Sequence, residues 1–178
     1  MATLAIRPNG AGDLTEIDAQ SPNTGEHWDK VDEADPHDSD DTTVHQPTVG
    51  ASQATDLYNL ESISDSIINI TNVTVYATWA RQGGAVLDPK FWIKIKTGGT
   101  IYTTPSWDNE PTSYTTRSYA WATNPQSGVT WIVADINALQ AGIMLERVIA
   151  GGVDPYGKCT QVYVVITYAP FVPKIFYF

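Results

Sequence analysis

The sequence predicts an all-β protein: an antiparallel β-sandwich of jelly-roll type, with one short helix and an extended C-terminal arm. Three observations predict it. Apolar and polar residues alternate through several β-branched and aromatic runs, turn residues recur about every 8–12 residues, and a single stretch has helical spacing. A chain of 178 residues suits one domain. We expect that domain to cover residues 1–169 and the arm to cover residues 170–178.

The first clear strand is ITNVTVYATWA, residues 70–80. Val73, Val75 and Trp79 fall on one face of an extended chain, with the period of two that a half-buried strand requires. The next run, FWIKIKTGGTIYTT, places Ile93 and Ile95 on one face and then reaches Gly98 and Gly99. Two adjacent glycines between alternating segments predict a β-hairpin.

Two further strands are predicted in SYTTRSYAWAT and GKCTQVYVVITYAP. Between them, GVTWIVADINALQAG has apolar residues at three- and four-residue spacing, which predicts one short helix over Trp131–Gln140. Thr130 would cap its start and Gly142 would end it. The expected core comprises Val73, Val75, Trp79, Ile93, Ile95, Val162, Val164 and Ile166.

Residues 26–41 stand out by composition, because they carry many acidic side chains and few apolar ones. We expect an acidic surface loop that is mostly exposed, performs no catalysis and binds no transition metal. The three histidines His27, His37 and His45 lie in or beside it, but their spacing matches no zinc motif. They are interpreted as incidental residues of a solvated loop.

Calcium is the one cofactor that this loop leaves open, since closely spaced carboxylates offer hard oxygen ligands. The weak calcium candidates are Asp35, Asp38, Asp40 and Asp41. The stretch lacks the glycine and the bidentate glutamate of an EF-hand. The alternative is that Asp38, Asp40 and Asp41 cap turns before the strand at Thr42. No other metal or cofactor is expected.

Enzyme activity is not expected, because the sequence has no GxSxG elbow, phosphate-binding glycine loop or converging pair of carboxylates. Exposed aromatic rings could instead stack on sugars. Trp107, in the polar segment TPSWDNEP, is the first candidate for glycan binding and Trp28 is the second. The other four tryptophans lie in strand or helix patterns, where a core position is expected.

Charge and cysteine content exclude other classes. A net charge of −10 disfavours nucleic acid and anionic membranes as partners. Cys159 is the single cysteine and cannot form an internal disulfide. The N-terminus does not resemble a secretory signal and nothing is long and apolar enough for a membrane span, so we expect synthesis in the cytoplasm and a soluble product.

The C-terminal arm, PFVPKIFYF, is the most apolar segment and holds three of the four phenylalanines. Pro170 and Pro173 cannot donate hydrogen bonds to a sheet, so the arm should leave the sandwich as an extended segment. Exposed aromatic clusters usually mark interaction sites. Alternatively, the arm folds back over the open end of its own sandwich. The predicted partner-binding residues are Phe171, Val172, Ile175, Phe176, Tyr177 and Phe178.

The order of several segments resembles a family of β-sandwich domains found among structural proteins of tailed bacteriophages. The resemblance runs from Thr3 to Pro170. The arm lies beyond it. The segments that carry the resemblance are TLAIRPNGAGDLTEI, VDE with DDTTV, TDLYNL, ITNVTVYATWA, SYAWATNPQSGVTWIVADINALQAGIML and CTQVYVVITYAP. Members of this kind resemble capsid decoration proteins, minor tail or head accessory proteins and small jelly-roll binding modules.

The resemblance implies a virion structural protein, most simply a capsid decoration or cement protein, made in the host cytoplasm and located on the virion. Its partners would be the major capsid protein, other virion subunits, or further copies of itself in a trimer. The main alternative is a carbohydrate- or receptor-binding module of a phage tail or fibre. A subunit of an extracellular filament is a third interpretation.

Overall fold

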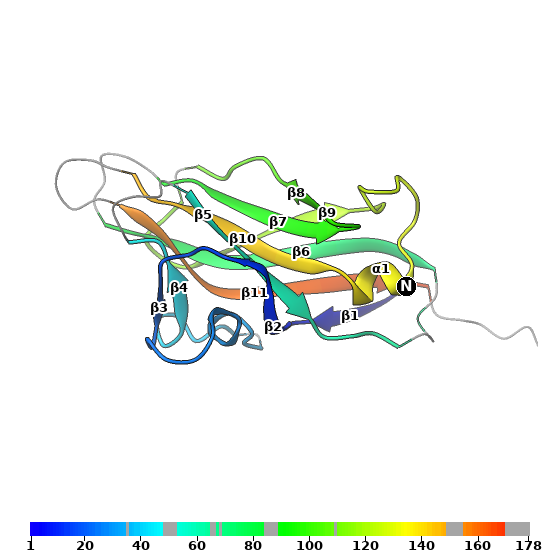
Figure 1. Cartoon of the computed structure of the whole chain (residues 1–178), viewed down its shortest axis with the longest axis horizontal. Coiled ribbons are helices and arrows are strands. Elements are labelled where there is room, and N and C mark those ends of the chain that lie inside the picture. Colours follow the sequence, from blue (N-terminus) through cyan, green and yellow to red (C-terminus); the bar gives the residue numbers. More distant parts are fainter. Residues whose placement is uncertain are drawn as a thin grey trace, which may run out of the picture.

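The computed structural model describes residues 1–34, 36–47, 53–64, 67, 69–83, 89–108, 110–148 and 155–169. Eleven strands and two short helical segments account for most of them (Figure 1). The strands are β1 (Ala2–Ile6), β2 (Pro8–Thr15), β3 (Ala19–Ser21), β4 (Thr43–His45), β5 (Gln53–Leu60), β6 (Ile70–Gln82), β7 (Phe91–Thr97), β8 (Thr100–Thr103), β9 (Thr115–Trp121), β10 (Gln140–Glu146) and β11 (Tyr156–Tyr168). The helical segments are the 3-10 turn η1 (His27–Lys30) and α1 (Val133–Asn137).

The strands form two antiparallel sheets, which confirms the predicted all-β sandwich. One sheet has the order β3-β4-β11-β6-β9, with β1 also paired to β11, and the other has the order β2-β5-β10-β7-β8. Of the connections between successive strands, those that stay within one sheet are β3 to β4 and β7 to β8. β11 is a central strand of the first sheet. It pairs with β6 along one edge, and its other edge pairs with β4 near its start and with β1 near its end.

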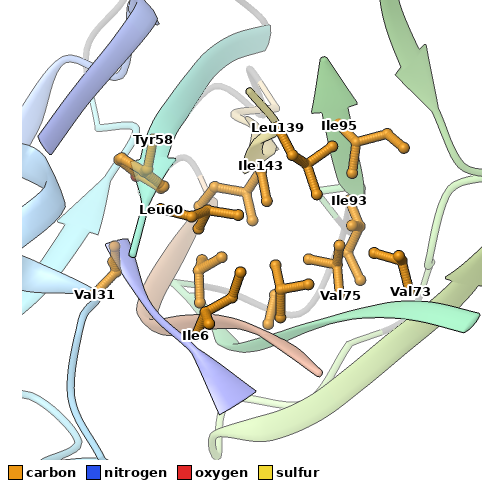
Figure 2. Packing of buried hydrophobic residues seen from close by; sticks show 14 of the residues in the cluster. Ile6, Val31, Tyr58, Leu60, Val73, Val75, Ile93, Ile95, Leu139 and Ile143 are labelled. Carbon is orange, nitrogen blue, oxygen red and sulfur yellow. The ribbon is translucent and has the colours of Figure 1, made fainter. Parts of the chain in front are cut away.

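The core lies between the two sheets and contains every residue predicted for it, each fully buried. Figure 2 shows Val73 and Val75 of β6 pointing toward Ile93 of β7 and Ile143 of β10. The hairpin is also confirmed, since Gly98 and Gly99 join β7 to β8 with φ of 55° and 82°. Positive φ at both positions suits a tight turn whose twist matches the flanking strands.

The helix is real but shorter than predicted, and both of its predicted ends are wrong. The N-cap residue is Ile132 rather than Thr130, and its amide donates to Oδ2 of Asp135 at 3.3 Å. Gly142 lies inside β10, where it faces Leu57 of β5. A Cβ at Gly142 would come within 1.9 Å of the Asp56 carbonyl oxygen, so close approach between strand backbones explains the glycine.

The acidic segment 26–41 is more embedded than the expected exposed loop. Among its described residues, Lys30 is 6% exposed and Val31 is fully buried. The Val31 carbonyl accepts the amide of Val162 in β11 at 2.7 Å, so this segment is attached to the first sheet. The exposed residues are a minority: Glu26, Ala34, Pro36, Ser39, Asp40 and Asp41.

The C-terminal arm and Asp35 lie outside the described residues, and so do the partner-binding positions predicted in the arm. The last described residue is Ala169, directly after β11. Neither helical segment is long or apolar enough to cross a membrane, and the same holds throughout the part of the chain that was described.

Candidate functional site

The two tryptophans predicted to bind glycans are both partly buried against the core. The backbone of Trp107 exchanges hydrogen bonds of 3.1 and 2.8 Å with Phe91 at the start of β7. Its indole meets the ring of Trp79 edge to face, with centroids 5.4 Å apart. Trp107 therefore anchors its loop, and part of its ring is occupied by the core. Trp28 belongs to η1 and packs on the same cluster.

Two of the calcium candidates form hydrogen bonds within the protein. Asp38 caps a turn, because its Oδ1 accepts the Thr42 amide at 3.3 Å and its carbonyl accepts the Asp41 amide at 3.5 Å. Oδ1 of Asp40 binds Nζ of Lys158 at 2.5 Å and the hydroxyl of Tyr114 at 2.7 Å. The hydrogen bond from Lys158 lowers the pKa of Asp40.

Asp41 is exposed. Across the described ranges, no three His, Cys, Asp or Glu side chains are grouped so that they could hold a metal ion. Asp38 makes the contacts expected of a turn cap, and Asp40 forms an ion pair with Lys158.

Glu33 and Asp38 share one hydroxyl. Oγ1 of Thr42 contacts Oε1 of Glu33 and lies 2.8 Å from Oδ2 of Asp38. A hydroxyl has one proton and cannot donate to both carboxylates at once. A proton on Glu33 resolves this, because the acid can then donate to Thr42 while Thr42 donates to Asp38. Burial raises the pKa of Glu33 to about 7, which favours that protonated form.

From the sequence, His27 was interpreted as an incidental residue of a solvated loop, but the structure gives it a specific partner. Its Nδ1 lies 2.6 Å from Oδ2 of Asp56, a fully buried carboxylate in β5. The hydrogen bond to Asp56 raises the pKa of His27, although burial acts in the opposite direction. Asp56 also accepts the amides of Glu16 and Ile17 at 2.8 and 3.0 Å and the hydroxyl of Tyr58 at 3.3 Å.

This cluster holds three segments together: the residues directly after β2, η1 and β5. The His27–Asp56 pair therefore contributes to the scaffold. Its sequence signal is weak, because the two residues are 29 positions apart.

A polar pocket of about 320 Å³ opens beside β4 and the start of β11. Lys158 contributes a side chain that is 11% exposed, pairs with Asp40 and lies 4.9 Å from the centre of the Tyr114 ring. Burial, followed by the charge of Lys158, lowers the pKa of His45. The pocket can offer hydrogen bonds and aromatic faces to a polar ligand. Its lining residues are Ser21, Asp40, Thr43, His45, Gln82, Tyr156 and Lys158.

A second pocket, of about 440 Å³, lies at the end of the sandwich that carries α1 and the N-terminus (Figure 1). We call it the end pocket and define it by residues 69–71, before and at the start of β6, and residues 130–132, before α1. Trp131 is 2% exposed and Ile132 is 58% exposed. The pocket therefore joins a buried indole to an exposed aliphatic side chain.

The end pocket also adjoins the point at which the described chain stops. The amide of Ala169 donates to the Asn69 carbonyl at 3.1 Å, and Asn69 lines the pocket. Met1 is 94% exposed, and its sulfur lies 3.9 Å from the hydroxyl oxygen of Thr71. Val129, next to the pocket in sequence, is 60% exposed. Sequence reasoning identified the arm but not this surface, because the segments that form it are far apart in the chain.

Cys159 is fully buried in β11. Burial raises the pKa of its thiol to about 12, so the thiolate needed for nucleophilic or redox chemistry is suppressed.

Comparison with known proteins leaves the sequence resemblance without support from outside the chain. A scan against protein-family models finds no match, and a search of curated proteins finds none either.

Proposed function

We propose that this protein is a non-enzymatic structural protein that works by binding neighbouring subunits, and that it is a decoration or cement protein of a bacteriophage virion. The C-terminal arm is the binding element. The major capsid protein, another virion subunit or a further copy of this chain is the partner.

The observation that carries the binding role is the gathering of exposed apolar side chains where the arm begins. Met1 and Ile132 belong to the small set of large hydrophobic residues that are exposed in the described chain. Both lie at the end where Ala169 meets Asn69. Apolar patches on a folded protein usually mark an interaction site, and buried aromatic anchors carry much of the energy of such interfaces.

The scaffold is suited to this role. Its core is closed between two sheets, and Asp56 and Asp38 are engaged in internal hydrogen bonds. Such a domain can present a sticky segment without depending on it for folding. The net charge of −10 supports solubility before assembly and discourages nonspecific contact with DNA. The virion assignment itself rests on the resemblance of the sequence to phage structural domains.

Deleting Phe171–Phe178 tests the role of the arm. The truncated domain should melt at nearly the same temperature as the full chain while losing its incorporation into the particle or oligomer. A variant with Phe171, Phe176 and Phe178 replaced by serine is the matched control, since it keeps the length of the arm. A truncated protein that loses several degrees of stability and still assembles would assign the arm to its own core.

The virion assignment has a separate test. The protein should co-purify with an assembled particle through a density gradient, at a fixed number of copies per particle. Its presence solely in the soluble fraction would contradict the assignment.

A carbohydrate- or receptor-binding module is the second candidate, and the polar pocket beside β4 favours it. His45 and Tyr156 offer aromatic faces there, while Lys158 and Asp40 offer hydrogen bonds. A glycan array separates the two functions. Glycan binding that is lost in Tyr156→Ala or Trp107→Ala would support the second candidate, whereas an array without binding supports assembly.

A further inference from the structure

We propose that the end pocket is the receptor for the C-terminal arm, and that it receives the arm of a second copy of this chain. Two copies then exchange arms reciprocally about a twofold axis. This inference rests on the proposed binding role of the arm and adds the site and the partner.

The arm starts beside the end pocket. Ala169 is the last described residue, and its amide is bonded to the carbonyl of Asn69 on the rim of the end pocket. The root of the arm and the pocket therefore share one end of the sandwich. The side chains of Met1 and Ile132 are exposed at this same end.

Two prolines restrict the backbone at the start of the arm. Pro170 and Pro173 fix their own φ angles, and Ala169 and Val172 are biased toward extended conformations because each precedes a proline. Four extended residues, 170–173, span about 13 Å. If residues 170–173 are extended, they form a spacer long enough to carry Ile175, Phe176 and Phe178 to a neighbouring molecule.

The end pocket suits the arm in volume and in chemistry. Its volume of about 440 Å³ falls within the range of about 300–1,000 Å³ that is typical of ligand sites. Its lining combines three apolar residues, Ile70, Trp131 and Ile132, with three polar ones, Asn69, Thr71 and Thr130. A lining of buried apolar and exposed polar residues suits a peptide that brings aromatic side chains and main-chain donors.

An exchange of arms between two copies is compatible with twofold symmetry. Because the root of the arm and the pocket lie at the same end, two copies that meet end to end can place each root opposite the other copy's pocket. This is an isologous contact, in which both molecules use the same surface, and closed twofold dimers are the commonest oligomers.

Sedimentation velocity of the purified full chain tests the inference. The wild type should sediment with twice the mass of one chain, and deletion of 171–178 should reduce it to the monomer. Ile132→Asp should do the same while the arm is intact. Aspartate is a favoured N-cap residue, so this variant should keep α1 folded. Ile101→Asp is the matched control, because Ile101 is also exposed but lies on β8 outside the pocket.

Mixing the two defective chains gives the sharpest result. The deletion variant has a pocket without an arm, and Ile132→Asp has an arm without a working pocket. Together they should form a heterodimer with one arm–pocket contact, which an affinity tag on one chain would detect. A monomeric wild type, a dimer that survives both changes, or a mixture that stays monomeric would each overturn the inference.

Failure here can be distinguished from failure of the proposed function. If the wild type is monomeric in solution but deletion of the arm still abolishes incorporation into the particle, the arm binds another subunit. The proposed function then stands, and the exchange between copies is wrong.

Discussion

Nδ1 of His27 lies 2.6 Å from Oδ2 of Asp56, and the carboxylate has no exposed surface. The contact joins the acidic segment to the middle of β5. It explains why a segment so rich in charge follows a defined path over the sandwich. It also places a titratable pair inside the scaffold, which makes the stability of the fold depend on pH.

Replacing Asp56 with alanine should destabilise the protein by about 3–5 kcal/mol, because it removes one partner of a buried charged pair. The amides of Glu16 and Ile17 would lose their acceptor as well. Urea denaturation measures the effect. Asp41→Ala is the control, since this exposed acid should change stability by less than about 0.5 kcal/mol. Equal effects of the two substitutions would contradict the role assigned to Asp56.

The His27–Asp56 pair should stabilise the fold less as the pH rises. The hydrogen bond to Asp56 raises the pKa of His27 in the folded state above its usual value of 6.5. The contribution is therefore complete below the pKa of the unfolded chain and is lost as the pH rises through the folded pKa. In His27→Gln, the denaturation midpoint should fall less steeply than in wild type above pH 6.5. Parallel profiles for the two proteins would show that His27 does not contribute.

Ionisation of Glu33 should also lower the stability of the fold as the pH rises, but over a lower pH range. Its pKa is raised from 4.5 to about 7, so the fold loses stability between these pH values as the acid ionises. Glu33→Gln mimics the protonated form. It should raise stability by about 1–2 kcal/mol at pH 8, after allowance for solvent screening, and change it little at pH 4.5. Denaturation at these two pH values checks the result, and an equal effect at both would exclude titration as the cause.

Gly142→Ala should destabilise the protein by about 3 kcal/mol or more, because the backbone of β5 must move to admit the methyl group. The nearest atom would be the Asp56 carbonyl oxygen at 1.9 Å. At Gly10 in β2, the nearest atoms to a new Cβ are 3.8 Å away. Gly10→Ala should therefore change stability by less than about 1 kcal/mol. Thermal melting of both variants provides the comparison.

Local patterns were sufficient for the parts of the fold that depend on neighbouring residues. The alternation around Val73 and Val75 and the glycine pair at the hairpin predicted strands and a turn that the structure contains. The buried faces of β6, β7 and β11 followed from the same period of two. These features are encoded within a few residues, so one sequence is enough to find them.

The errors came from contacts between distant segments. Gly142 looked like the end of a helix, but its lack of a side chain is required by the backbone of β5. No prediction was made for Asp56 from the sequence, and its carboxylate lies against His27 in η1. The end pocket combines residues about 60 positions apart, a pairing that spacing and composition do not encode.

The most direct test of the central claim is photo-crosslinking from the arm. A photoreactive phenylalanine analogue would replace Phe176 in the full chain, and isotopically light and heavy copies would be mixed before irradiation, alone and with the particle. The account predicts products that join two polypeptides, either a light copy to a heavy copy or this chain to a particle subunit. Crosslinks found solely within single chains would show that the arm packs on its own domain, and would contradict the account.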